Sequence, residues 1–327
     1  MPDPVIRRHP QNPVLASGDV PFPSTQIFNA GVARFRGEYV MVFRADRFDR
    51  EKRCEAGTAL GIAFSSDGVK WQVRAEPLKV LPTGGEIRRA YDPRLTVLDD
   101  HLYLCFAVDT AHGIRGGVAV TDDLQRFEVL GLSAPDNRNM VLFPERIKGK
   151  LARLERPFPV YGSAGRGPER FDIWYSESVD GRHWGNTQLV LGSEQVSYCN
   201  NKIGPGTPPL RTPHGWLALF HYVYKDDARV LKGWEPYPWT KLYGAGVMLL
   251  DLQEPWRVIG LSREPVLVPE TSYELDGFRG SVIFPGGLLA EQDGTVKTYY
   301  GAADTVECLA TARLDDLLAL AQPVVPQ

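Results

Sequence analysis

The sequence predicts an all-β protein, and within that class a five-bladed β-propeller. Two kinds of observation support the prediction: apolar stretches that follow turn signals, and two short motifs that recur along the chain. A chain of 327 residues fits one large domain or two medium ones. Because the motifs recur over most of its length, we expect a single propeller domain over residues 1–327. A short N-terminal extension and a C-terminal tail should pack on it.

Apolar stretches rich in aromatic and β-branched residues indicate the strands. Each closely follows a turn signal, such as Arg36-Gly37 or Asp293-Gly294, which is the pattern of antiparallel hairpins. One short helix is expected over residues 314–320, closed off by Pro323. The clearest strand stretches are residues 39–43, 102–108, 216–220 and 298–300.

A polar turn followed by an aromatic residue recurs at residues 65–71, 121–127 and 178–184, with a weaker copy at 251–256. A second motif opens each repeating unit, at residues 28–31, 91–94, 140–144, 204–209 and 282–287. Five openers indicate five blades, each a four-stranded sheet around one axis. A β-sandwich would produce strands without these two recurring motifs, so the propeller is favoured. The innermost strand of each blade lines the central channel, and polar residues at its start should converge on one funnel.

Charge and composition exclude several classes of function. The formal net charge is −3, which argues against a general binder of nucleic acid or another polyanion. No apolar run is long enough to cross a bilayer, and the N-terminus lacks the hydrophobic core of a signal peptide. Four cysteines without C-x-x-C spacing indicate neither a disulfide framework nor a zinc site. A soluble, cytoplasmic protein without membrane or nucleic-acid partners is expected.

Asp92 stands out in the second opener, between Tyr91 and Pro93 and before Arg94. Asp-Pro commonly starts a turn, so Asp92 could simply cap the backbone. The alternative is an inward carboxyl group that Tyr91 and Arg94 orient and whose pKa they tune for acid–base chemistry.

Four basic side chains fall near the openers: Arg138, Arg156, Lys202 and His221. Each alone is better explained as a surface charge or a satisfied core histidine. Together in one funnel they would repel one another unless an anion completed the site. A phosphate oxyanion matches the guanidinium fork.

Two loops remain open to more than one interpretation. The glycine-rich stretch 162–167 lacks the context of a phosphate-binding loop, so it is expected to be a plain connection that could reach over the funnel. The aromatic residues Trp234, Tyr237 and Trp239 lie in a proline-rich loop. They could stack on sugar rings or serve equally well as a packed loop cover.

Several motifs, in one order over about residues 12–318, resemble those of glycoside hydrolase family 130, the β-mannoside phosphorylases. The resemblance is carried by Tyr91-Asp92-Pro93-Arg94, Asn137-Arg138-Asn139 with Phe143-Pro144-Glu145, Arg156-Pro157, Lys202-Ile203-Gly204 with Thr207-Pro208-Pro209, Val282-Ile283-Phe284-Pro285-Gly286-Gly287 and Tyr299-Tyr300-Gly301-Ala302-Ala303-Asp304-Thr305. The family implies a five-bladed β-propeller. Some of its members cleave β-mannosides with inorganic phosphate, and others use water.

The resemblance also implies roles for individual residues. Asp92 matches the single catalytic acid. The phosphate-binding set would be Arg138, Arg156, Lys202, His221 and Tyr243. The residues around the substrate would be Asn29, Arg44, Asp46, Tyr91, Asn139, Asp276, Phe284 and Asp304. Ala30 stands where some relatives have Ser, so one sugar contact is expected to be missing.

The implied reaction is inverting phosphorolysis, with inorganic phosphate as co-substrate, no metal and no organic cofactor. An inverting hydrolase needs an acid and a base. Phosphate is already an anionic nucleophile, so one carboxyl group suffices, and its proton would reach the glycosidic oxygen through a sugar hydroxyl. The products would be α-mannose 1-phosphate and a shortened sugar.

Two alternatives stay open from the sequence alone. A hydrolase of the same fold would need a second carboxylate, for which Glu145 and Glu86 are candidates. A non-catalytic carbohydrate-binding propeller would not need Asp92 and the cationic cluster together. The β-1,4 or β-1,2 linkage, the acceptor sugar and homo-oligomerisation through loops leave no signature in the sequence.

Overall fold

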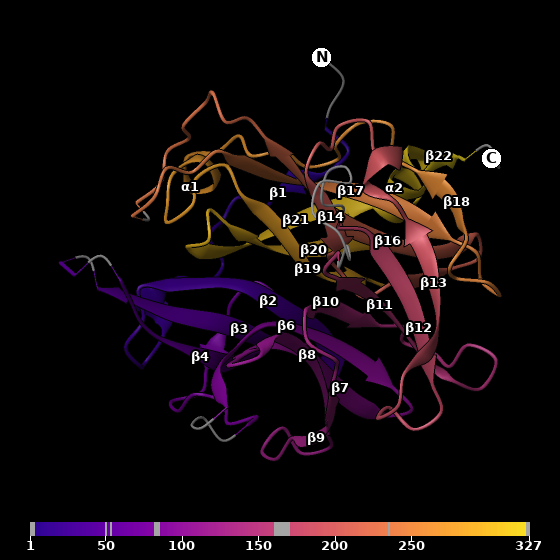
Figure 1. The fold of residues 1–327 in the computed structure, drawn as a ribbon, viewed down its shortest axis with the longest axis horizontal. Helices are drawn as coiled ribbons and strands as arrows, with labels where there is room; N and C mark the ends of the chain where they lie inside the picture. Colours follow the sequence, from indigo (N-terminus) through magenta and orange to yellow (C-terminus); the bar gives the residue numbers. More distant parts are fainter. Residues whose placement is uncertain are drawn as a thin grey trace.

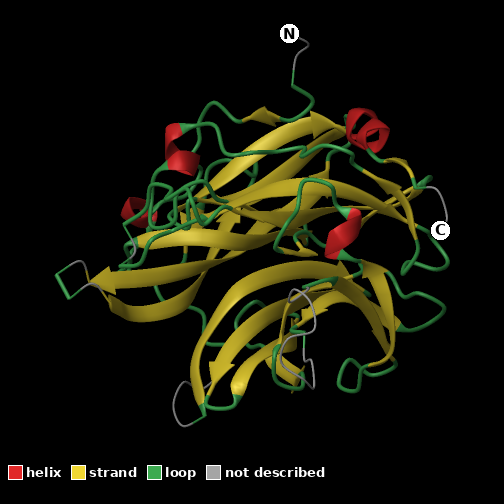
Figure 2. Ribbon diagram, turned by 45° about the horizontal axis from the view of Figure 1, so that its top comes forward, coloured by secondary structure: helices red, strands yellow, loops and turns green. Residues whose placement is uncertain are grey.

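The computed structural model describes residues 4–49, 51–52, 54–81, 86–159, 171–234 and 236–324. It consists mainly of antiparallel strands, which form five sheets arranged around a common centre (Figures 1 and 2). The predicted all-β fold and its five-bladed propeller architecture are therefore confirmed. The glycine-rich stretch 162–167 lies outside the described residues. Within them, no helix has the length and apolar character needed to cross a membrane.

The first three blades are four-stranded sheets whose strands follow one another along the chain. Blade 1 contains β2 (Gln26–Phe35), β3 (Glu38–Asp49), β4 (Cys54–Ser65) and β5 (Gln72–Val73). Blade 2 contains β6 (Ile87–Leu98), β7 (His101–Thr110), β8 (Gly113–Thr121) and β9 (Glu128–Leu132). Blade 3 contains β10 (Asn137–Leu142), β11 (Leu151–Pro157), β12 (Ile173–Ser178) and β13 (Gly185–Leu191).

The last two blades include strands from the ends of the chain. Blade 4 contains β14 (Lys202–Pro205), β15 (Leu210–Thr212), β16 (Gly215–Lys225), β17 (Lys241–Leu250), β18 (Val258–Leu261) and β22 (Gln322–Pro323). Blade 5 contains β19 (Ile283–Ala290), β20 (Thr295–Ala302), β21 (Val306–Arg313) and β1 (Arg7–Arg8). Because β1 pairs with β21, the N-terminal strand completes the last blade and closes the ring.

Helices are short and lie at the periphery (Figure 2). The predicted helix is present as α2 (Leu314–Leu320), and its Leu317 is buried in the apolar cluster between blades 4 and 5. A one-turn helix, α1 (Ser272–Leu275), lies in the connection between β18 and β19. Two 3₁₀ turns, η1 (Ser17–Asp19) and η2 (Ser193–Gln195), complete the helical segments of the described chain.

Each junction between neighbouring blades holds its own apolar cluster. Strands in the middle of a blade therefore bury both faces, as β7 does over Leu102–Val108. This explains why the apolar stretches in the sequence are continuous rather than alternating. Burial of both sheet faces supplies the hydrophobic stabilisation of the ring.

The recurring polar turn occupies the same place in successive blades, after the third strand and before the fourth. In each copy one Asp oxygen accepts two backbone N–H groups, at Asp67, Asp123 and Asp180, and Asp251 does the same in blade 4. The aromatic residue that follows packs toward the preceding blade: Trp71 lies edge-on to Tyr299 and Trp256 lies beside Tyr175. The prediction that these motifs are equivalent is confirmed.

A bulge in the innermost strand turns one polar side chain into the funnel in each of the first three blades. The bulged residues are Asn29, Asp92 and Asn139, with φ of 56°, 51° and 59°. The third opener was therefore placed too late: its structural equivalent begins at Arg138, because the register shift runs from Arg138 to Val141. Asn and Asp tolerate this left-handed backbone better than most residues do.

Arg94 fills the propeller axis immediately beyond the bulge of blade 2. It is only 3% exposed. Its guanidinium donates to the carbonyl oxygens of Asn29, Pro93, Gly206 and Pro285, which belong to, or directly follow, the inner strands of four blades. Arg94 therefore ties these blades together at the centre instead of orienting Asp92 through a hydrogen bond.

Candidate active site

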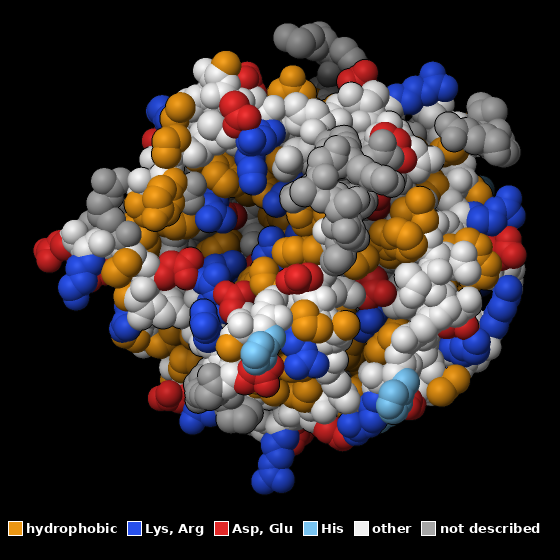
Figure 3. All heavy atoms as spheres, viewed as in Figure 1, with side chains coloured by type: hydrophobic (Ala, Val, Ile, Leu, Met, Phe, Trp, Pro, Cys, Tyr) orange, Lys and Arg blue, Asp and Glu red, His pale blue; other side chains and the backbone are white. Residues whose placement is uncertain are grey.

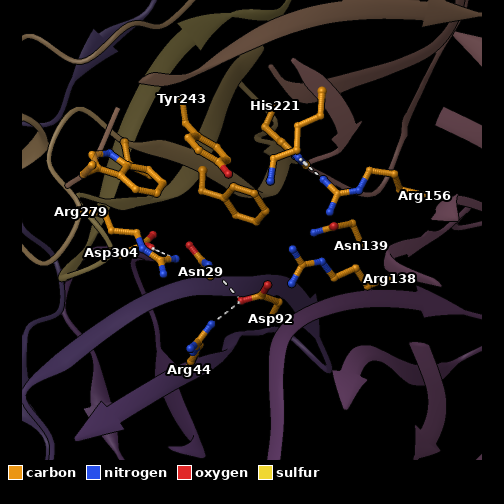
Figure 4. Close-up of a pocket in the computed structure, with 14 residues that line it drawn as sticks. Asn29, Arg44, Asp92, Arg138, Asn139, Arg156, His221, Tyr243, Arg279 and Asp304 are labelled. Carbon is orange, nitrogen blue, oxygen red and sulfur yellow. Dashed lines mark hydrogen bonds and ion pairs between the residues drawn. The ribbon is translucent and has the colours of Figure 1, made fainter. Parts of the chain in front are cut away.

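One pocket at the funnel collects most of the predicted site residues. Figure 3 shows a hollow in this face with basic and acidic side chains around it, and Figure 4 shows how the labelled residues point toward one another. The lining comes from all five blades and their connections. It consists of Asn29, Arg44, Asp92, Arg138, Asn139, Arg156, Lys202, His221, Trp239, Tyr243, Arg279, Val282, Phe284 and Asp304.

Two residues of blade 1 contact the Asp92 carboxylate and stabilise its ionised form. Asn29 Nδ2 donates to Asp92 Oδ1 at 3.0 Å, and Arg44 Nη1 lies 3.4 Å from the same oxygen (Figure 4). Burial by itself would raise the pKa of Asp92. The charges of Arg44 and Arg138 and the bond from Asn29 outweigh burial, so the pKa is lowered. Asp92 is therefore ionised beside these groups, and it must gain a proton before it can act as an acid.

Arg44 owes its position to residues behind the pocket lining. Asp46 accepts from Arg44 Nε at 2.9 Å, and the guanidinium lies between the rings of Phe28 and Tyr91, at 4.7 and 5.0 Å from their centroids. Tyr91 is buried, and its hydroxyl donates to Asp109 at 2.7 Å. Asp46 and Tyr91 thus support Arg44 from outside the pocket.

Arg138, Arg156 and Lys202 share the other side of the pocket. In the described part of the chain, no carboxylate lies within ion-pair distance of any of them. Burial and the charge of Arg138 lower the pKa of Arg156 to about 9. Burial, followed by the charges of Arg156 and Arg138, lowers the pKa of Lys202 well below its usual range. Such a cluster gains stability from an anion.

His221 reaches the pocket across the inner strand of blade 4. Of the four basic residues in the predicted phosphate-binding set, Arg138 and Lys202 lie on the innermost strands of their blades, and Arg156 and His221 lie on the second strands. The strand of His221, β16, continues to Lys225. Opposite His221 stands Gly204, where an added Cβ would lie 2.5 Å from His221 Cε1 and 3.1 Å from Arg156 Cδ. The missing side chain at Gly204 lets both reach inward.

Tyr243, on β17, completes the cationic side. Its ring lies 5.4 Å from Lys202 Nζ and stacks on Trp239 at 5.9 Å between centroids. Phe284, on β19, lies 4.5 Å from the His221 ring and covers the guanidinium of Arg94 at 5.2 Å. Phe284 therefore separates the pocket from the blades' central arginine.

A second carboxylate, Asp304, faces the pocket from the turn between β20 and β21. Its side chain is 14% exposed and lies 3.4 Å from Arg279 Nη1. Burial raises the pKa of Asp304 to about 6, against the lowering effect of Arg279 and Arg44. Arg279 was not predicted from the sequence, because it belongs to the irregular connection before β19. Val282 begins the predicted fifth opener but was not singled out as a site residue.

The three aromatic residues of the proline-rich loop, Trp234, Tyr237 and Trp239, lie in different surroundings. Trp239 is 9% exposed, lines the pocket and donates from Nε1 to Gly280 O at 2.8 Å. Trp234 packs against Phe48 and Phe278. Tyr237 is 76% exposed. One ring is thus available to a pocket ligand, and one serves as loop cover.

Three candidate carboxylates lie outside the pocket lining. Asp276 is largely exposed and pairs with Lys232 at 3.7 Å. Glu145 is half-exposed and pairs with Arg211 at 3.2 Å. Glu86 is also half-exposed and lies 3.8 Å from Arg115. In the described chain, the carboxylates that line the pocket are Asp92 and Asp304.

The chain is similar to known proteins over nearly its whole length. The family model described as beta-1,4-mannooligosaccharide phosphorylase, of glycoside hydrolase family 130, matches residues 5–322. A beta-1,4-mannooligosaccharide phosphorylase of Ruminococcus albus is 31% identical, over 96% of this chain and 90% of the relative. A 1,2-beta-oligomannan phosphorylase of Thermoanaerobacter sp. is 29% identical, over 95% and 98%.

Solved structures agree with the sequence comparison. The beta-1,2-mannobiose phosphorylase of Listeria innocua, solved in complex with beta-1,2-mannobiose, superposes with a TM-score of 0.82. It has 25% sequence identity, and the match covers 97% of this chain and 99% of that one. The pocket described above has a buried aspartate, Asp92, and a cationic cluster facing one space. The chain therefore belongs to glycoside hydrolase family 130, and it is a glycoside phosphorylase.

Proposed function

We propose that the protein catalyses inverting phosphorolysis of a β-mannoside, with α-mannose 1-phosphate as one product. The observation that supports this most is the cationic side of the pocket. Arg138, Arg156 and Lys202 face the same space as Asp92 and have no carboxylate partner in the described chain. A water-using enzyme would gain nothing from gathering three basic side chains there, since they repel one another and are costly to bury.

In the proposed reaction, phosphate binds to Arg138, Arg156 and Lys202, with Tyr243 beside them. A phosphate oxygen attacks the anomeric carbon of the mannosyl unit, and the bond from that carbon to the glycosidic oxygen breaks. The departing oxygen receives the proton of Asp92, directly or through a sugar hydroxyl. Attack opposite the leaving group converts the β-linkage into an α-phosphate.

The mannosyl unit is proposed to lie between Asp92 and Asp304. Asn29, Arg44, Asn139 and Asp304 present hydrogen-bonding groups to this part of the pocket. The side-chain oxygens of Asn29 and Asn139 are buried and have no hydrogen-bond partner in the described chain, so sugar hydroxyls could donate to them. Fixing the sugar and phosphate in line is the larger part of such a catalyst's contribution.

The relatives act on differently linked substrates, β-1,4 in one case and β-1,2 in others, as their names state. The linkage is tested by incubating β-1,4- and β-1,2-mannobiose separately, with and without phosphate. We expect α-mannose 1-phosphate from one of them, and only when phosphate is present.

Three results would contradict the proposal. Free mannose at the same rate in phosphate-free buffer would indicate a hydrolase. Turnover of neither disaccharide, together with no phosphate release from α-mannose 1-phosphate and acceptor sugars, would indicate a binding protein. A β-configured phosphate product would exclude inversion.

A further inference from the structure

Two aromatic rings lie against the cationic side of the pocket, outside the set that lines it. Phe158 follows β11, and Phe171 precedes β12, so the two rings flank the connection between these strands. They pack edge-to-face with centroids 5.3 Å apart. Both backbones are anchored: Phe158 N–H donates to Asp136 O, and Ile203 N–H donates to Phe171 O.

The rings face the three cations. The guanidinium of Arg156 lies 5.4 Å from the Phe171 centroid, and Lys202 Nζ lies 5.9 Å from the same ring. The guanidinium of Arg138 lies 5.5 Å from the Phe158 centroid. These distances are within the range in which an aromatic face attracts a cation.

A ring and a carboxylate stabilise a buried cation in different ways. A carboxylate neutralises the charge and occupies its N–H donors, so an incoming oxyanion would have to displace it. A ring face offsets part of the cost of burial but accepts no conventional hydrogen bond. Among the residues that the structure describes, the buried Nε groups of Arg138 and Arg156 have no hydrogen-bond partner. The donors thus remain available to an oxyanion.

We propose that Phe171, supported by Phe158, is a positioning residue for phosphate. Its ring holds Arg156 and Lys202 in place without neutralising their charge, and it leaves their donors available to an oxyanion, apart from Arg156 Nη1, which donates to His221. The proposal rests on the phosphorolytic function proposed above, and it adds two residues that contact the cations rather than the phosphate. It predicts that the ring controls affinity for phosphate and not affinity for the sugar.

The test compares Phe171→Leu with Phe171→Tyr, which keeps the aromatic face. Phe64→Leu is the matched control, because Phe64 is another half-buried ring under a guanidinium, that of Arg74 at 5.6 Å, and it does not line the pocket. Binding of inorganic phosphate is measured by calorimetry and by its effect on Tm, both without turnover. The Michaelis constants for phosphate and for the mannoside are then measured separately.

We expect Phe171→Leu to weaken phosphate binding roughly 3- to 30-fold, as loss of a cation–π contact implies. The KM for the mannoside should stay within about twofold, and Phe171→Tyr and Phe64→Leu should bind phosphate as the wild type does. If Phe171→Leu does not fold, Phe158→Leu tests the same idea through Arg138 alone and should show a smaller loss.

Unchanged phosphate affinity in a folded Phe171→Leu protein would overturn the proposal, as would an equal loss in Phe64→Leu or in Phe171→Tyr. A wild-type protein that binds phosphate but releases only mannose would refute the phosphorolytic function. In that case the binding data would still decide the role of the ring.

Discussion

Nη1 of Arg156 lies 3.0 Å from Nε2 of His221, and the guanidinium must be the donor in this contact. The accepting Nε2 therefore carries no proton, and the proton of the neutral imidazole is on Nδ1. Burial and the charge of Arg156 lower the pKa of His221 well below its usual range, which agrees with this assignment. His221 thus holds Arg156 without adding to the positive charge of the pocket.

The first prediction concerns Arg156 itself. Arg156→Ala should raise the KM for phosphate roughly 10- to 100-fold, the cost of losing charge-assisted hydrogen bonds, with little change in the KM for the mannoside. Arg156→Lys should recover only part of the loss, because an ammonium cannot make the two-pronged contact. Steady-state kinetics with each substrate varied in turn checks this. Arg211→Ala, an exposed arginine outside the pocket, is the control. A rise of equal size in both Michaelis constants would argue against a phosphate-specific role.

The second prediction concerns Asp92. Asp92→Asn should fold normally, because Asn tolerates the φ of 51° at this bulge and can still accept from Asn29. Its turnover of a β-mannobiose should fall roughly 10²–10⁴-fold, since an amide cannot supply the proton. An aryl β-mannoside whose leaving group needs no protonation should lose much less. Near-wild-type turnover of the disaccharide would show that Asp92 only shapes the turn.

The third prediction couples anion binding to proton uptake. Burial and the charges of Arg156 and Arg138 lower the pKa of Lys202, and the charges of Arg44 and Arg138 lower the pKa of Asp92 against the effect of burial. A bound anion offsets this positive charge and raises both pKa values, so anion binding should be accompanied by proton uptake from solution. Calorimetry with sulfate, which does not titrate in this range, in two buffers of different ionisation enthalpy measures the uptake.

The control for this experiment is Asp92→Asn, which should take up fewer protons on binding sulfate. Proton release, or identical apparent enthalpies in the two buffers, would count against the coupling. The same coupling would explain how the ionised Asp92 gains the proton that it needs as an acid when phosphate binds.

The fourth prediction concerns stability and pH. Glu307 is buried, accepts the N–H of Ala30 at 3.1 Å, and has its pKa raised by burial to about 8 from its ordinary 4.5. Between these values the unfolded chain releases the proton and the folded chain keeps it. Stability is therefore lost as pH rises through this window, on the order of a few kcal/mol in total. Glu307→Gln should flatten the fall in Tm from pH 5 to pH 8.

Glu291, on the same blade, is the control, because its ionisation is expected to change stability with pH in the opposite direction. Burial would raise its pKa, but Tyr39 and Lys297 lower it, so its ionised form stabilises the fold above about pH 4.5. Glu291→Gln should lower Tm at neutral pH. An unchanged pH slope in Glu307→Gln would mean that Glu307 is not a protonated buried acid.

Local sequence patterns predicted the blades well because each blade repeats the same short-range interactions. The aspartate turns, the hairpins and the helix at Leu314–Leu320 depend on residues close in sequence. Asp92 was identifiable because it stands in such a repeat. Arg138, Arg156, Lys202 and His221 were identifiable because they fall near the openers, and the resemblance to a known family added Tyr243 and the residues expected around the substrate.

The remaining site residues depend on contacts between distant segments. Arg279 lies in an irregular connection without periodicity, and nothing nearby in sequence indicates that it meets Asp304. The inward reach of His221 depends on the missing side chain at Gly204. Phe158 and Phe171 look like ordinary strand-flanking aromatics until the cations of other strands are placed above them.

The arginine at the propeller axis has a consequence for kinetics. Arg94 is bound to four carbonyl groups of different blades and is covered by Phe284, so we expect the funnel to be closed on this side of the pocket. Both substrates and both products must then use the mouth. A ligand held deep in such a pocket cannot leave while another molecule stands above it. Binding and release should therefore follow a compulsory order. Product-inhibition kinetics would reveal it, because only one product would then inhibit competitively against one substrate.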